Sequence, residues 1–129
     1  MEFKVGMSAT ITDTVSEKNT AERVGSGSLK VFATPAMIAL MEKAACEAIA
    51  EGLESGSTTV GTLINAEHVS ATPLGMTVTV TATVTEVQGR KICFSVEASD
   101  EAGVIGKGYH ERFVVFSEKF MAKTEAKGK

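Results

Sequence analysis

Three side chains of this sequence, Thr34, Glu42 and His68, have the chemistry of an acid–base site. A glutamate can act as a general base or nucleophile, a threonine hydroxyl can donate a hydrogen bond, and a histidine can orient a carboxylate or protonate a leaving group. Glu42 carries the strongest signal, because on a helical wheel it lies about 40° from Ile38 and about 20° from Ile49, inside an apolar arc. A carboxylate there is costly unless it is paired, so Glu42 marks either a dry catalytic cleft or a rim position bonded to a neighbouring strand.

Thr34 and His68 also have plain structural interpretations. Thr34 precedes Pro35, and this order is typical of a helix N-cap followed by the first helical residue. The free N–H groups at such a helix start would suit the oxygen of a carbonyl that becomes an oxyanion. His68 lies at the predicted end of a strand, where an ordinary surface or core histidine is the more common case.

Two further polar residues, His110 and Arg112, fall on the same face of one predicted strand. Cross-strand pairing is the favoured interpretation of both, and binding of a phosphate or carboxylate is the minority one. Other familiar sites are missing, since the sequence has no glycine-rich phosphate loop, no spaced Cys and His set and no serine nucleophile elbow. We therefore expect no bound metal, and any chemistry must use threonine, glutamate, histidine and backbone amides.

One long helix and five strands are predicted to hold these residues in place. The helix is expected over residues 35–54, with Thr34 as its N-cap, and the polar, glycine-rich residues 16–28 are predicted to form a loop. Alternating apolar residues and short turns predict strands at residues 7–15, 58–69, 77–85, 92–98 and 104–116. Short turns join antiparallel neighbours, and one helix must cover one face. We therefore expect an α+β domain in which a curved antiparallel sheet wraps around the helix.

The composition is that of one soluble domain spanning residues 1–129. Hydrophobic residues make up 43% of the chain and charged residues 22%, which allows a core and leaves an ordinary charge content. No apolar run could span a membrane and no secretion signal is recognised, so we expect a cytoplasmic protein. The net charge of −3 and the single tyrosine disfavour nucleic acid as a partner. Cys46 and Cys93 are too few for a disulfide framework, and residues 117–129 are expected to be a flexible basic tail.

A series of short motifs along the chain resembles the fluoroacetyl-CoA thioesterase family. They are Thr34-Pro35 at the helix start, Glu42 within the helix, Val60-Gly61-Thr62 in the next strand, and His68 before Pro73-Leu74-Gly75. The later run Gly108-Tyr109-His110-Glu111-Arg112-Phe113 is also similar to the family. The resemblance covers residues 7–116, and it rests on the ordered spacing because no single motif is decisive.

This resemblance implies a hotdog fold, a homodimer with acyl-CoA at the subunit interface, and no cofactor apart from the CoA of the substrate. The implied function is hydrolysis of a short or small acyl-CoA to the free acid and CoA, with Thr34, Glu42 and His68 as the catalytic set. Gly61 matches a family glycine that lets the acyl group approach the backbone. Arg112 matches a family arginine, so both residues are expected to bind substrate. Whether two dimers pair further into a tetramer stays open.

Two features of the sequence qualify this expectation. Residues 25–28, Gly-Ser-Gly-Ser, stand where the fluoroacetyl-specific member of the family has a phenylalanine-bearing lid, so we expect a more open site without strict fluoroacetyl specificity. Thr34 and Glu42 lie about 12 Å apart along one helix axis. Either the substrate bridges them, or the working site combines residues of two subunits.

Two other functions remain as alternatives. The first is a non-catalytic acyl-CoA-binding or regulatory module, because fold alone does not establish catalysis. The second is a hotdog hydratase or dehydratase, which usually carries an Asp/His pair in a different motif that is not found here. The CoA phosphates have four candidate partners of equal merit, namely Lys30, Arg90, Lys91 and Lys107.

Overall fold

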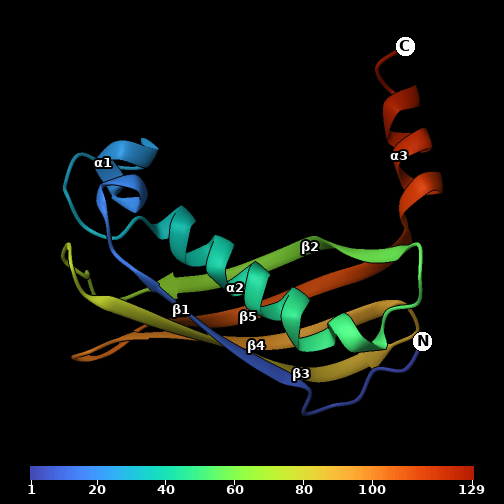
Figure 1. The fold of residues 1–129 in the computed structure, drawn as a ribbon, viewed down its shortest axis with the longest axis horizontal. Coiled ribbons are helices and arrows are strands. Elements are labelled where there is room, and N and C mark those ends of the chain that lie inside the picture. Colours follow the sequence, from blue (N-terminus) through green and yellow to red (C-terminus); the bar gives the residue numbers. More distant parts are fainter.

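A five-stranded antiparallel sheet with one long helix on one face forms the body of the protein (Figure 1). The computed structural model describes all of residues 1–129. The strands are β1 (Ser8–Thr14), β2 (Ser57–His68), β3 (Thr77–Gln88), β4 (Lys91–Asp100) and β5 (Gly103–Phe116). The α-helices are α1 (Ala21–Val24), α2 (Thr34–Ile49) and α3 (Ser117–Ala126), and the 3-10 turns are η1 (Glu17–Asn19) and η2 (Ala50–Gly52). This is the α+β architecture that the sequence predicts.

The strands lie in the order β1-β3-β4-β5-β2, so β1 and β2 are the two edges of the sheet. Tight turns join β3 to β4 and β4 to β5, which makes these three strands an antiparallel meander. The alternation of threonine and apolar residues in β3 buries Val78, Val80, Ala82 and Val84 on the face toward α2. β2 pairs with β5 alone, so one edge of this 12-residue strand has no strand partner.

The long helix α2 packs mainly against β1 and β3, and less against β4 and β2. Its buried face centres on Met41 and Ala45, both fully enclosed. Glu42 lies at the edge of that face, toward β2, and 42% of its side chain is exposed. Glu42 therefore lies at the rim and is bonded to a strand residue, because a single edge strand does not enclose this side of α2, and its catalytic role stays a prediction.

Both ends of α2 differ from the prediction. The N-cap is Ala33, which has no capping side chain, and Thr34 is the first residue of the helix. The prediction of Thr34 as N-cap is wrong because its hydroxyl is bonded elsewhere, to His68. The α-helix ends at Ile49 and tightens into η2, so the predicted extension to residue 54 is also wrong, as is common for a last helical turn.

The predicted loop at residues 16–28 contains two short helical turns. Ser16 and Asn19 form a reciprocal capping box around η1, and the Thr20 hydroxyl caps α1. Gly25 ends α1 in a left-handed conformation, with φ of 91°. These local hydrogen bonds shape the segment that lies beside the start of α2 (Figure 1).

The C-terminal segment, expected to be a flexible basic tail, forms the helix α3 instead. This helix has no buried residue and extends away from the sheet (Figure 1). No helix of the structure combines the length and apolar character needed to cross a bilayer.

Candidate active site

A β-bulge in β2 brings two separated residues of that strand to the same face. The register with β5 shifts between Gly61 and Leu63, so Thr62 is an extra residue in β2. In a regular strand Gly61 and His68 would point to opposite faces, because side chains alternate with a period of two. The extra residue reverses this parity, and both positions then face α2.

Glu42 extends from α2 to an arginine on the sheet. Its Oε2 accepts a hydrogen bond from Arg112 Nη1 of β5 at 3.1 Å, and the two groups form an ion pair. The side chain of Arg112 is only 7% exposed. The structure has no hydrogen bond to the other carboxylate oxygen of Glu42, Oε1, which is therefore free for water or a substrate.

The guanidinium of Arg112 is held on several sides. Its Nε donates to Thr59 Oγ1 at 2.8 Å, its Nη2 donates to the Thr59 carbonyl at 3.1 Å, and its Nη1 also donates to His110 Nε2 at 3.2 Å. Together with the bond to Glu42, four of its N–H groups have protein partners. Since a guanidinium has about five N–H donors, nearly all of them fix the position of Arg112 relative to Glu42.

Gly61 lies against the Glu42 carboxylate, where a larger residue does not fit. A Cβ built on Gly61 would overlap Glu42 Oε2 and would lie 3.2 Å from Arg112 Nη1 and 3.3 Å from His110 Cε1. The bare backbone at this position therefore permits the close approach of charged groups, and it would permit that of a small acyl group. We call Thr59, Gly61, His110, Arg112 and Glu42 the Glu42 cluster.

A second pair of polar side chains lies at the start of α2. Thr34 Oγ1 and His68 Nδ1 are 2.7 Å apart, whereas His68 Nε2 is buried without a hydrogen-bond partner. Burial lowers the pKa of His68 from its ordinary value, so the imidazole is neutral at neutral pH. A buried nitrogen without a partner is costly, and a ligand group in this pocket would relieve that cost.

A pocket of about 240 Å³ opens beside the Thr34–His68 pair. Phe32 stands edge-on to the His68 ring, with ring centroids 6.3 Å apart, and forms part of the apolar lining. Ser26, from the Gly-Ser-Gly-Ser stretch, contributes to the rim. The side chains at this rim are small, so the entrance carries no aromatic cover.

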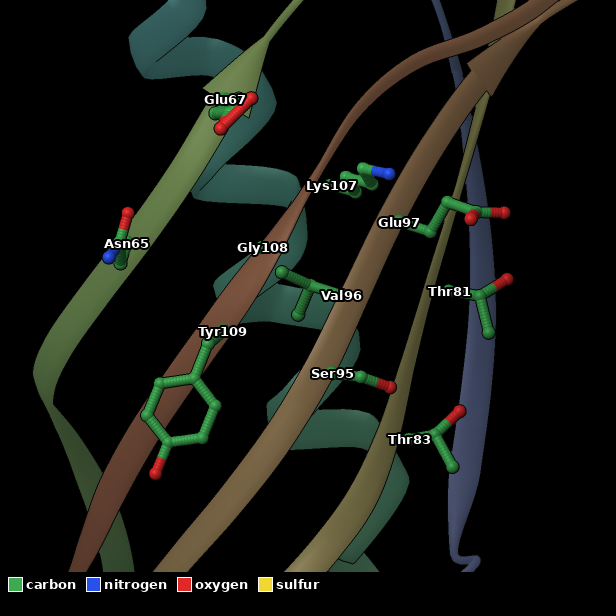
Figure 2. A pocket seen from close by; sticks show the side chains of 10 residues that line it. All are labelled: Asn65, Glu67, Thr81, Thr83, Ser95, Val96, Glu97, Lys107, Gly108 and Tyr109. Carbon is green, nitrogen blue, oxygen red and sulfur yellow. The ribbon is translucent and has the colours of Figure 1, made fainter.

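The largest hollow of the molecule, about 700 Å³, lies on the opposite face of the sheet and away from α2 (Figure 2). Lys107 stands in register with Glu67 on one side and Glu97 on the other. A phosphate ligand would meet two carboxylates for each ammonium there. The candidate site is therefore the face toward α2, where Glu42, His68 and Thr34 lie.

Comparison with known proteins agrees with this site. Residues 15–118 match the family model of the fluoroacetyl-CoA-specific thioesterase. The chain belongs to this family. The fluoroacetyl-CoA thioesterase of Streptantibioticus cattleyicolor is 48% identical to it over 98 residues, which are 76% of this chain and 70% of the relative.

Two solved structures are similar in fold to this family member. A mutant of the fluoroacetyl-CoA-specific thioesterase FlK, in complex with fluoroacetate and CoA, matches with a TM-score of 0.87 and 40% identity, over 92% of this chain and 99% of that one. A hot-dog-like protein from Thermanaerovibrio acidaminovorans matches with a TM-score of 0.88 and 28% identity, over 97% and 93% of the two chains. The hotdog fold that the sequence motifs imply is therefore confirmed.

The structure divides the predicted site residues of this family member between two places. Glu42, Gly61 and Arg112 meet in the Glu42 cluster, and Thr34 and His68 form a separate pair. Within one chain His68 bonds Thr34 rather than Glu42, so an orienting contact from His68 to Glu42 is absent. The catalytic and substrate-binding roles assigned to these five residues stay predictions.

Sequence reasoning missed two contributors to the site. Thr59 holds two N–H groups of Arg112, and the bulge at Thr62 sets the parity of β2. Thr59 carried no signal, because threonine is ordinary in a strand. The bulge had a weak signal in the sequence, because a glycine in a strand interior, here Gly61, is typical of a bulge or a close backbone approach. The expected cross-strand pairing of His110 and Arg112 is confirmed by their bonds to Leu63 and Thr59 of β2.

Proposed function

We propose that this protein hydrolyses short acyl-CoA thioesters, with Glu42 as the residue that attacks the carbonyl or activates water to do so. The supporting observation is the Glu42 cluster: a half-exposed carboxylate is fixed by a buried arginine beside a glycine that leaves room for a small group. The matched relative is a fluoroacetyl-CoA thioesterase, and the chemistry of thioester cleavage suits this arrangement. The non-catalytic acyl-CoA-binding alternative is not favoured.

The start of α2 supplies the second half of the proposed chemistry. Ala33 gives no side-chain cap, so the first-turn N–H groups of α2 are not occupied by a capping oxygen. These N–H groups and the Thr34 hydroxyl would stabilise the negative oxygen of the tetrahedral intermediate. Water adds to the carbonyl carbon, the C–S bond breaks, and the CoA thiolate takes up a proton delivered by Glu42 or by His68. The products are a free carboxylic acid and CoA.

The rim of the pocket supports a broader range of acyl groups than fluoroacetyl alone. Gly25, Ser26, Gly27 and Ser28 are exposed and carry no aromatic side chain that would cover the pocket. Selectivity for one small substituent needs a closely fitting enclosure, because differences of a single small group in a loose pocket are worth only about 1–3 kcal/mol. We therefore propose that the enzyme accepts several small acyl groups, including acetyl.

We further propose that two copies form a homodimer through β2. A long edge strand with an unpaired side is open to pairing with a second chain, and Leu63 on β2 is 45% exposed. Two identical strands that pair about a two-fold axis run antiparallel. The end of β2 at His68 then approaches the early part of the second copy's β2. Each Thr34–His68 pair would face the partner subunit's Glu42, which would join the two halves of the site.

The test of the activity is release of free thiol from acetyl-, propionyl-, butyryl-, phenylacetyl- and fluoroacetyl-CoA. Glu42→Gln is expected to abolish release while the protein stays folded. Glu47→Gln is the matched control, because Glu47 lies on the exposed side of the same helix. Full activity in folded Glu42→Gln would refute the assignment. Saturable binding of acyl-CoA without release by the wild type would support a binding module instead.

The test of the shared site is complementation between two impaired variants, each altered in one half of the site. Thr34→Val and Glu42→Gln are mixed under conditions that exchange subunits. If each site uses residues of both copies, random exchange restores about a quarter of wild-type activity, because half of the dimers are mixed and each has one intact site. A mixture that gains no activity over the average of the two variants after verified exchange would place each site within one chain. Sedimentation should give twice the 13.5 kDa of one chain.

A further inference from the structure

We propose that His110 is a positioning residue, which acts through Arg112 to hold the Glu42 carboxylate in its working place. This inference rests on the proposed hydrolysis at Glu42. His110 itself is buried, with 1% of its surface exposed, so it does not contact substrate. Its effect on the reaction passes through a single hydrogen bond to Arg112 Nη1.

Two contacts fix the orientation of the His110 ring. Its Nδ1 lies 2.8 Å from the carbonyl oxygen of Leu63, at the bulge of β2. Its face packs against Phe94 of β4, with ring centroids 5.8 Å apart. The ring therefore has little freedom to turn, and its second nitrogen, Nε2, points at Arg112.

The partners of the two nitrogens determine where the proton is. A carbonyl oxygen can only accept, so Nδ1 must carry the hydrogen and donate to Leu63. Arg112 is permanently protonated and can only donate, so Nε2 must be the acceptor. His110 is therefore the neutral Nδ1–H tautomer. Burial lowers its pKa from the ordinary value, and the charge of Arg112 acts in the same direction, which agrees with this assignment.

The charged groups around the His110 ring leave it neutral. Glu42 and Glu111 both favour the protonated ring, but burial and Arg112 oppose it more strongly. A protonated Nε2 would point a hydrogen at the Nη1 hydrogens of Arg112. A neutral His110 is thus required for Arg112 Nη1 to direct its other hydrogen at Glu42 Oε2.

Two substitutions separate the acceptor role from the anchoring role. His110→Gln places an acceptor near the position of Nε2, and His110→Asn keeps a donor near the position of Nδ1 but has no group that reaches Arg112. We expect His110→Gln to retain at least about ten times the kcat of His110→Asn, since the hydrogen bond that only Gln can replace is to a charged group and is therefore a strong one. A ring that serves only to anchor the bulge at Leu63 would give the reverse order, and that result would overturn the proposal.

A double-mutant cycle tests whether the effect passes through Arg112. In an Arg112→Lys background the His110 acceptor has lost its partner, so adding His110→Asn is expected to reduce kcat by less than about twofold. Losses that multiply instead would show that His110 acts independently of Arg112 and would overturn the proposal. Thermal unfolding of each variant accompanies the kinetics, so that a folding defect is recognised as such.

A measurement without any substrate separates this proposal from the proposed function. The chain has two histidines, so the imidazole nitrogen spectrum of His68→Asn by NMR belongs to His110 alone. We expect the neutral Nδ1–H tautomer at neutral pH, even if no acyl-CoA is hydrolysed. An Nε2–H tautomer or a charged ring would overturn the positioning role directly, whereas absence of thiol release in the wild type would refute only the proposed function.

Discussion

Gly61→Ala is expected to separate activity from stability in this protein. The added Cβ overlaps Glu42 Oε2 and lies 3.2 Å from Arg112 Nη1, so one group must move. The carboxylate is the end of a flexible, half-exposed side chain, whereas Arg112 is held by Thr59 and His110. Glu42 will therefore shift, by about 1 Å to reach an ordinary van der Waals distance.

The two consequences of that shift differ in size. A displacement of about 1 Å in a catalytic group costs on the order of 100-fold in rate. The free energy of unfolding should fall by no more than about 1 kcal/mol, because the ion pair is partly exposed and the charges stay close. In a domain of this size that corresponds to a fall of about 4 °C in Tm.

The assay is thiol release from acetyl-CoA, run beside thermal unfolding of the same preparations. Gly128→Ala is the matched control, since a Cβ there makes only an ordinary contact, 3.5 Å from the Glu125 carbonyl oxygen. Gly61→Ala with wild-type kcat/KM would refute the reasoning, because activity would then not depend on the observed position of the Glu42 carboxylate. A large loss of Tm would refute it differently, by showing that Gly61 supports the fold.

Two further predictions follow from the Thr34–His68 pair and from the two histidines, whose pKa values burial lowers. Thr34→Val should lower kcat by about 10–100-fold through loss of the hydroxyl, and its stability should fall by no more than the lost hydrogen bond to His68, about 1 kcal/mol, because Ala33 and not Thr34 is the N-cap; an unchanged kcat in the folded variant would refute the role of the hydroxyl. The pKa values of His68 and His110 are lowered in the folded state from 6.5, so between the folded and unfolded pKa values the unfolded chain binds more protons. The free energy of unfolding should therefore fall as the pH drops below about 6.5. Chemical denaturation at a series of pH values checks this, and His68→Asn should reduce the slope; an unchanged slope would contradict the lowered pKa of His68 in the folded state.

Local patterns predicted most of the fold. The alternation in β3 and the helical period of α2 depend on which face of each element is apolar, and that property is present in the sequence before any packing occurs. The polarity of residues 16–28 indicated a loop, but the capping bonds of Ser16 and Thr20 turned parts of it helical. Such bonds depend on backbone geometry that composition does not specify.

Much less of the candidate site followed from these patterns. Glu42 was identified because its type conflicts with its place on the helix, which is a property of the sequence alone. Its partner was not, since Arg112 lies 70 residues further along the chain and no local pattern links the two. The sequence left open whether His68 orients Glu42 or protonates the leaving group; within one chain its bond is to Thr34, because the first turn of α2 lies beside the end of β2.

The sequence by itself determined the element types, the antiparallel β3-β4-β5 connections and the residue that does not suit its helix, because these depend on local periodicity and on tight turns. The expectation that β2 and β3 are neighbours is wrong, since β2 pairs with β5 at the far edge of the sheet. Only the tertiary structure decided which polar groups meet. The bulge at Thr62 reverses the parity of β2, and the position of α2 near β1 and β3 leaves Glu42 at the open side toward β2. Both effects depend on the register between strands and on how a helix packs across a sheet. These are settled by the summed burial of many residues rather than by any one segment.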